Sequence, residues 1–226
     1  MIYRFIKRLE DIIFSISILF FFIPILIIVV VLSIFFQGFP VFYVSKRYVS
    51  INKSIRIIKF RSMVRDAKSK KYDLHGKYMR DGYLDIPLSS NVYTKFGRFL
   101  EKSQFVELPQ LFGVLFGKLS FIGNRPLPIE NIKELRRKFP DKWEKRFDCP
   151  AGMTGISQVV GKYNLSASKR IELENLYSKV YTEGNVLKAD TYIFFSTIIL
   201  LILRDSIAYR SYDNAKAMLI SCLKTR

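Results

Sequence analysis

The sequence contains few residues of the types that usually build metal or disulfide sites. It has 2 cysteines, 1 histidine and 1 tryptophan in 226 residues. Cys149 and Cys222 form no Cys-x-x-Cys motif, which argues against a disulfide scaffold or a zinc site and favours a reducing compartment. His75 lies in a polar stretch and is expected to be a solvated loop residue. The chain also lacks a P-loop, a Gly-x-Gly-x-x-Gly turn and a His-Glu-x-x-His motif, so none of those sites is expected.

Acidic side chains are scarce as well. There are 19 of them against 37 basic ones, which gives a formal net charge of +18. Such an excess implies an anionic partner: nucleic acid, acidic lipid or a phosphorylated substrate. Half of the residues, 50%, are hydrophobic, so a membrane surface is favoured over nucleic acid. A membrane-tethered nucleic-acid binder is the weaker alternative, because the chain has no interleaved platform of aromatic and basic residues.

One long uncharged segment, residues 12–36, is present near the N-terminus. It exceeds the ~20 residues that a helix needs to span a bilayer, and no cleavage site of a signal peptide follows it. Pro24 in its middle predicts a kink. A spanning helix and a bent helix that enters and leaves by one face both remain open. Basic residues at both ends, which would sit together at one cytoplasmic surface, favour the bent helix: Arg4, Lys7 and Arg8 before it, and Lys46, Arg47, Lys53 and Arg56 after it.

The remainder, residues 39–226, is expected to be one domain, separate from a membrane segment at 1–38. Residues 41–60 predict a β-hairpin, with strands at 41–44 and 55–58. Residues 66–92 are polar, without a periodic element, and predict a mobile loop.

Helices are expected in the second half of the chain. Ile129, Ile132 and Leu135 predict a short basic amphipathic helix, suited to a lipid headgroup surface or to solvent. A stripe over 173–181 predicts a core helix. The apolar run 192–203 is too short to span a membrane, and 206–224 is a further amphipathic candidate. The predicted fold class is therefore α+β: a kinked re-entrant membrane helix, a short β-hairpin and a mainly helical domain with interfacial amphipathic helices.

The stretch 104–126 is the centre of the site expected from the sequence. Apolar residues recur at helical spacing, which predicts a helix with one buried face: Leu108, Leu111, Phe112, Leu115 and Phe116. Pro109 suits the first turn and Gly117 the C-terminal cap. Glu107 would then lie at a helix N-terminus, a natural place for an anionic ligand or a metal–phosphate pair.

The same stretch resembles the Asp-Glu-Leu-Pro-Gln … Gly-Pro-Arg-Pro signature of the bacterial sugar transferases, the monotopic phosphoglycosyl transferases. Here it is Val106-Glu107-Leu108-Pro109-Gln110 followed by Gly123-Asn124-Arg125-Pro126. Further motifs of that family recur in order. They are Lys59-Phe60-Arg61-Ser62-Met63, the Thr94-to-Leu100 approach, and the Thr-Gly loop at 149–159, which carries one extra residue, Ala151.

The resemblance implies a fold in which a kinked helix penetrates one leaflet of the bacterial inner membrane, with the globular part on the cytoplasmic face. It implies transfer of a sugar 1-phosphate from a UDP-sugar to undecaprenyl phosphate, with Mg²⁺ and release of UMP. Phospholipid and both substrates are the expected partners, no nucleic acid is expected, and a homodimer or a partner glycosyltransferase stays open. By position, Glu107 is the magnesium ligand, Arg61 and Arg125 are phosphate or nucleotide contacts, and Lys59 and Arg98 are weaker candidates.

Three positions depart from the family pattern. Val106 replaces the nucleophilic Asp, Asn124 replaces a Pro, and Lys118 replaces an acid after Gly117. A valine can neither form a phosphosugar bond nor bind a metal. Three readings remain: Asp81 or Asp85 takes the role, Glu107 is the nucleophile, or the chain is an inactive relative. Such a relative would serve as a membrane-bound scaffold or a nucleotide-sugar-binding partner.

Overall fold

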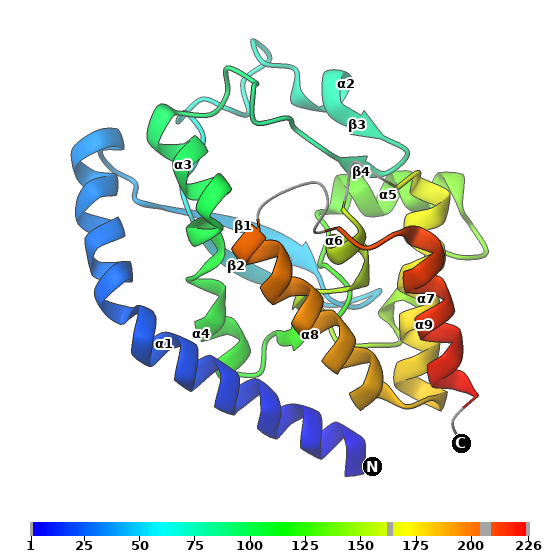
Figure 1. Cartoon of the computed structure of the whole chain (residues 1–226). Coiled ribbons are helices and arrows are strands. Elements are labelled where there is room, and N and C mark those ends of the chain that lie inside the picture. The colour runs from blue at the N-terminus through cyan, green and yellow to red at the C-terminus, as the bar shows by residue number, and fades with distance from the viewer. Residues whose placement is uncertain (1, 162–164, 204–208, 225–226) are drawn as a thin grey trace.

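The computed structural model describes residues 2–161, 165–203 and 209–224, and Figure 1 shows their helices and strands gathered beside one long N-terminal helix. Within the described residues the sheets have two strands each, β1–β2, β3–β4 and β5–β6, so the α+β class is confirmed. In chain order the elements are α1 (Ile2–Gln37), β1 (Phe42–Tyr48), β2 (Ser54–Phe60), α2 (Leu74–Tyr78), β3 (Met79–Arg80), β4 (Tyr83–Leu84), α3 (Lys95–Ser103), the 3-10 turn η1 (Phe105–Glu107), α4 (Gln110–Leu115), β5 (Ser120–Ile122), α5 (Ile129–Lys138), the 3-10 turn η2 (Lys145–Phe147), β6 (Gly152–Thr154), α6 (Ile156–Val160), α7 (Ala167–Glu183), α8 (Val186–Leu203) and α9 (Tyr212–Leu223).

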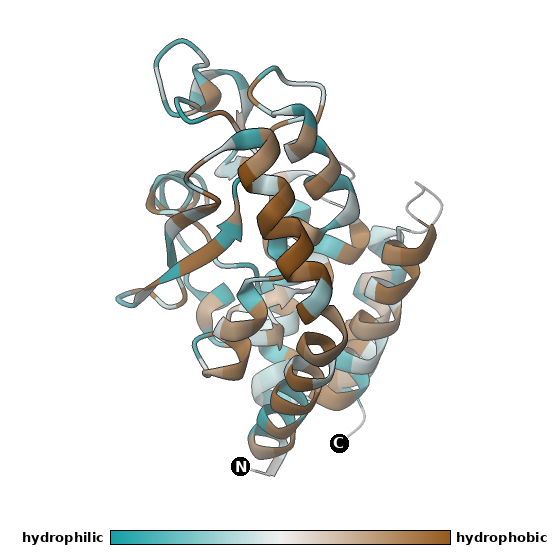
Figure 2. Ribbon diagram, turned by 90° about the vertical axis from the view of Figure 1, so that its left-hand side faces the viewer, coloured by the Kyte–Doolittle hydropathy of each residue, from teal (hydrophilic) through white to brown (hydrophobic). Residues whose placement is uncertain are grey.

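Helix α1 exposes most of its apolar surface. Two helices in the described part of the chain are long and apolar enough to cross a membrane, Tyr3–Gln37 and Val186–Leu203. Only 17% and 28% of their apolar windows are buried in the protein, which separates them from ordinary core helices. Figure 2 shows α1 brown over most of its length, and Figure 1 shows it changing direction partway along, with Pro24 inside the helix. So large an apolar surface supports association with a membrane.

The first turns of α1, in contrast, are held by the protein. Lys7 forms a buried ion pair with Asp190 of α8. Arg8 donates to two backbone carbonyls at the end of α4, at 2.7 Å each. The carboxylate of Asp11 accepts from the Phe121 N–H at 2.8 Å. Lys7 and Arg8, which the sequence placed among the basic residues flanking the apolar run, are therefore engaged inside the molecule.

The hairpin is confirmed, with longer strands than predicted. Strands β1 and β2 pair antiparallel from Phe42↔Phe60 to Tyr48↔Ser54. The predicted loop 66–92 was wrong in part, because it contains α2 and the hairpin β3–β4. Tyr83 of β4 packs in a buried cluster with Leu135 and Ile171, so a tertiary contact orders a segment that has no periodic pattern of its own.

Helix α4 is shorter than the predicted helix. Glu107 ends the separate turn η1, and Pro109 is the N-cap of α4 instead of a first-turn residue. Leu108 and Leu111 are buried as predicted, but Phe112 and Phe116 are 44% and 70% exposed. The predicted buried face was wrong for these two phenylalanines: Phe116 lies beyond the last residue of α4, and Phe112 lies within α4 on a face that the protein leaves exposed.

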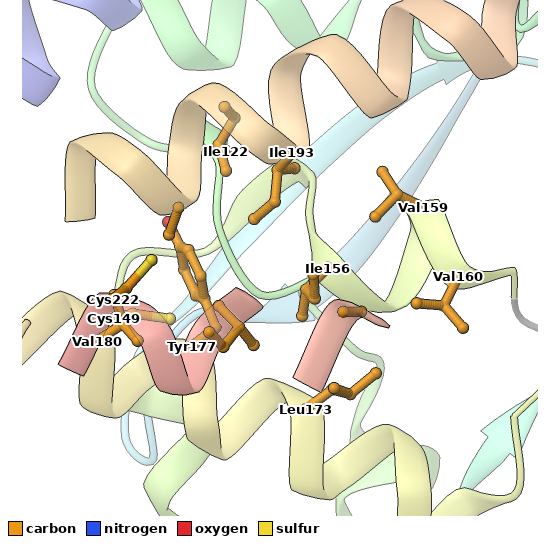
Figure 3. Close-up of a cluster of buried hydrophobic side chains, with 13 residues drawn as sticks. Ile122, Cys149, Ile156, Val159, Val160, Leu173, Tyr177, Val180, Ile193 and Cys222 are labelled. Carbon is orange, nitrogen blue, oxygen red and sulfur yellow. The ribbon is translucent and has the colours of Figure 1, made fainter. Parts of the chain in front are cut away.

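The main core lies between α6, α7, α8 and α9. Figure 3 shows Tyr177 and Val180 of α7, Ile193 of α8 and Ile156 of α6 directed toward one another, and all four are buried. The predicted core helix over 173–181 is confirmed as part of α7.

Helix α8 is longer than the twelve-residue run 192–203, since it begins at Val186. Asp190 interrupts the apolar pattern in the sequence, but Lys7 neutralises it in the fold. Helix α5 matches its prediction in position, and its buried residues Ile132 and Leu135 pack against Trp143 inside the protein instead of facing outward. Helix α9 lies within the predicted segment 206–224, of which residues 206–208 fall outside the described residues.

Candidate active site

Two cationic side chains from distant parts of the chain, Lys59 and Arg125, meet at the Glu107 carboxylate. Lys59 near the end of β2 donates to Glu107 Oε1 at 2.6 Å. Arg125, in the turn after β5, donates from Nη2 to the same oxygen at 2.5 Å and from Nη1 to Oε2 at 3.3 Å. The Glu107 side chain is only 13% exposed, so the carboxylate is largely withdrawn from water. The structure therefore brings together three of the five predicted site residues, and we refer to Glu107, Lys59 and Arg125 as the Glu107 cluster.

The charges in this cluster are strongly coupled. Burial by itself would raise the pKa of Glu107, but Arg125 and Lys59 hold that pKa far below its ordinary value. Burial lowers the pKa of Lys59, an effect that Glu107 opposes and that Arg125 and Arg47 reinforce. Glu107 raises the pKa of Arg125 against the effect of burial. At neutral pH Glu107 is an anion whose charge is already neutralised.

A network of buried hydrogen bonds holds the turn that carries Arg125. Asn124 donates from Nδ2 to the carbonyls of Arg146 and Glu174 at 2.9 Å each, and to Ser178 Oγ at 3.0 Å. Arg146 Nη2 donates to the Arg125 carbonyl at 2.8 Å, and Arg146 Nε donates to Glu174 Oε2 at 2.9 Å. The Asn124 side chain therefore has a structural role, because its hydrogen bonds fix the turn that presents Arg125.

A pocket opens next to the cluster, and only two of its lining residues, Lys59 and Arg125, were predicted as site residues from the sequence. It is lined by Arg47, Ile57, Lys59, Gln110, Arg125 and Pro126. Arg47 lies on the hairpin face that also carries Lys59, because residues paired across the strands share a face and alternate residues repeat it. Strand alternation with the correct register was therefore the signal that would have found Arg47.

Arg61 has other partners. Its Nε donates to the Pro40 carbonyl at 2.8 Å, and Nη2 donates to the carbonyls of Gln37 and Gly38 at 2.6 and 2.8 Å. The guanidinium therefore ties the end of α1 to β2 and does not join the Glu107 cluster. Arg98 donates to the Leu88 carbonyl at 3.2 Å and also lies outside the cluster.

The two acids that the sequence offered as alternative nucleophiles, Asp81 and Asp85, have partners elsewhere. Asp81 is exposed and pairs with Lys138. Asp85 lies 3.6 Å from Arg170. Val106 is 2% exposed and packs in a cluster that contains Phe60. His75 is exposed as predicted but lies in the short helix α2 instead of a loop, and Lys118 is also exposed.

The Thr-Gly loop contributes close backbone packing. Strand β6 pairs in parallel with β5, with Ser120 opposite Gly152. A Cβ atom at Gly152 would overlap the backbone of Gly123, and one at Gly155 would overlap the Gly123 carbonyl oxygen. The glycines of the loop therefore allow the chain to approach itself beside the Arg125 turn.

No group of three or more His, Cys, Asp or Glu side chains that could hold a metal occurs in the described residues. Glu107 supplies one carboxylate to the cluster. Magnesium typically uses one or two carboxylates and completes its shell with water and substrate phosphates. A single carboxylate fits a metal that arrives with a phosphorylated ligand, and does not fit a metal held by the protein alone.

Fold and site together define a membrane-associated protein with a pocket lined by three cationic side chains, Arg47, Lys59 and Arg125. The chain belongs to the bacterial sugar transferase family, whose pattern matches residues 2–204.

Its similarity to individual relatives is moderate. It is 32% identical over 193 residues to the UDP-glucose:undecaprenyl-phosphate glucose-1-phosphate transferase of Klebsiella pneumoniae, covering 85% of this chain and 39% of that protein. It is 31% identical over 206 residues to the undecaprenyl-phosphate galactose phosphotransferase of Salmonella typhimurium, covering 89% of this chain and 41% of that protein. The chain thus spans about two fifths of the length of these relatives.

Proposed function

We propose that the protein transfers a sugar 1-phosphate from a UDP-sugar to undecaprenyl phosphate at a membrane surface and so starts the synthesis of a bacterial surface glycan. The observation that carries this proposal is the Glu107 cluster beside a cationic pocket, in a chain of this family with an exposed apolar helix. The relatives named above carry out transfers of this kind. Those names favour the transferase over the inactive scaffold.

The chemistry requires two anions to meet. An oxygen of the lipid phosphate forms a bond to the sugar-bearing phosphorus, and the bond from that phosphorus to the oxygen of UMP breaks. Lys59 and Arg125 can neutralise the phosphates, and Arg125 offers a planar fork that matches phosphate oxygens. Because the site is already assembled and mostly buried, its charges stabilise the developing negative charge with little rearrangement.

Glu107 has two proposed roles. Before substrate binds, it holds Lys59 and Arg125 in place. With a UDP-sugar present, Glu107 would hold magnesium, which would add positive charge next to the diphosphate. Both Glu107 oxygens accept bonds from cations, so the metal would have to displace at least one of them.

Position 106 supplies no nucleophile, since Val106 is buried in an apolar cluster. Glu107 is tied to two cations, which lowers its readiness to attack phosphorus. We therefore favour direct attack by the lipid phosphate over a phosphosugar on the protein. A covalent route through Glu107 would trap labelled sugar phosphate on the chain in the absence of the lipid.

The membrane geometry is also a proposal. Helix α1 would enter one leaflet of the inner membrane, bend at Pro24 and return, with the domain on the cytoplasmic face. The exposed Phe112 and Phe116 support this placement, because they extend apolar surface from α1 onto α4. Undecaprenyl phosphate could then reach the Glu107 cluster from the bilayer.

The test is release of UMP by the purified full chain in nanodiscs, given undecaprenyl phosphate, magnesium and a panel of UDP-sugars. We expect turnover with at least one sugar, and its loss in Glu107→Gln. Glu134→Gln, which removes an acid paired with Arg137 at the surface, is the matched control. Absence of UMP release with every sugar, while UDP-sugars still bind, would establish the inactive relative instead.

A further inference from the structure

The pocket beside the Glu107 cluster contains more positive than negative charge. Arg47, Lys59 and Arg125 line it, and Glu107 is the carboxylate bonded to two of them. Three cations against one anion leave a net charge of +2. Like charges so close together are held at an energetic cost that a bound anion would remove.

Arg47 is the cation that Glu107 does not bond. Its hydrogen bond is from Nε to Ser45 Oγ at 3.0 Å, a neutral partner on the same strand. Burial, together with the nearby charge of Arg125, lowers the pKa of Arg47, and the more weakly acting Tyr43, Glu107 and Glu130 only partly oppose this. Most of its guanidinium donors have no protein acceptor in the described part of the chain, although the side chain is only partly exposed.

Gln110 is a second, independent sign of a ligand. It is 5% exposed and lines the same pocket. Its amide nitrogen is buried with no hydrogen-bond partner among the residues that the structure describes. A buried amide without a partner is destabilising, and native proteins rarely retain one without a bound group to satisfy it.

We propose that Arg47 and Gln110 form a subsite for a phosphoryl group next to the Glu107 cluster. Arg47 contributes charge and a forked donor, and Gln110 contributes an amide N–H. A phosphoryl group suits the pocket because it carries up to two negative charges and several acceptor oxygens, which match the excess charge and the free donors. The subsite deepens the proposed function, but binding does not require turnover. Its phosphoryl group belongs to the nucleotide or to the lipid, and the experiment separates these sources.

The test is calorimetric binding to the full chain in nanodiscs, without magnesium. UMP represents the nucleotide phosphate and farnesyl phosphate the lipid phosphate, and uridine and farnesol are their phosphate-free counterparts. We expect at least one phosphorylated probe to bind, and its phosphate-free counterpart to bind more weakly by about 10-fold or more. The probe that depends on Arg47 identifies the source.

Two variants address the two residues separately. Arg47→Gln should weaken that probe by about 10-fold, whereas Arg56→Gln, at an exposed position of the same hairpin, should not. Gln110→Leu should weaken it too, and should leave the unliganded protein at least as stable, because the leucine removes an unsatisfied buried amide. If Gln110 had only a structural role, Gln110→Leu would instead lower the unfolding temperature of the protein.

The outcomes distinguish the subsite from the proposed function. Binding that depends on Arg47 and Gln110, with no UMP release under any condition, would support the subsite and reject the transferase. Turnover combined with unchanged binding in both variants would reject the subsite. Equal binding of the phosphorylated probes and their phosphate-free counterparts would also reject it.

Discussion

Arg146 and Glu174 lie directly behind the turn that presents Arg125, and both side chains are 1% exposed. Replacing Arg146 with methionine keeps a long apolar side chain but removes the guanidinium. Glu174 would then keep its charge without its cation, and the Arg125 carbonyl would lose its donor. The substitution therefore tests whether this network maintains both the stability of the fold and the position of Arg125.

The magnitude follows from burial. Removing one partner of a buried ion pair costs about 3–5 kcal/mol, because the other charge stays in an apolar environment. In a chain of this size each kcal/mol shifts the unfolding temperature by ~2–4 °C, so we expect Arg146→Met to lower it by about 6–20 °C. The combined Arg146→Met and Glu174→Met variant should recover part of this loss, since no charge remains buried.

The assay is thermal unfolding of the full chain in detergent, followed by circular dichroism. Arg137→Met, which breaks the surface pair with Glu134, is the control and should change the unfolding temperature little. If Arg146→Met unfolds within about 2 °C of the parent protein, the network does not carry the stability assigned to it. A double variant no more stable than Arg146→Met would contradict the argument about the unpaired charge.

Further predictions concern the ion pairs and the glycine contact. Although burial opposes ionisation of Glu107, Arg125 and Lys59 hold its pKa far below the ordinary 4.5, so its contribution to stability should be complete above that value and decline as the pH falls below it. Unfolding temperatures measured in acid should therefore fall less steeply in Glu107→Gln than in the parent protein, and equal slopes would contradict this. Asp190→Asn should destabilise the fold by about 3–5 kcal/mol because it leaves Lys7 unpaired, and an unchanged thermal transition would count against the docking of α1. Gly155→Ala should lower stability through overlap with the Gly123 carbonyl, and an undisturbed unfolding temperature would show that the loop relaxes freely.

Much of the secondary structure follows from local patterns. The β-hairpin and the core helix α7 appear where two β-rich runs and the helical stripe predict them. The prediction for the segment 66–92 was wrong in part and that for the length of α8 was wrong, since local patterns do not show which distant residue will bury Tyr83 or neutralise Asp190.

The site was predicted in part. The motifs that carry the resemblance identify Glu107, Lys59 and Arg125, and the structure brings these together. The motif residue Arg61 has partners at the end of α1 instead. A sequence motif does not show which acceptors a guanidinium will reach in the fold.

The sequence by itself determined that the chain carries a long apolar segment, a large excess of positive charge and a carboxylate between apolar residues, because composition and periodicity are local properties. Only the tertiary structure decided which cations meet that carboxylate. Residues 59, 107 and 125 approach one another through the packing of β2, η1 and the turn after β5, and Arg47 and Gln110 join them through strand register and burial. These contacts depend on the whole fold, so no stretch of the sequence specifies them alone.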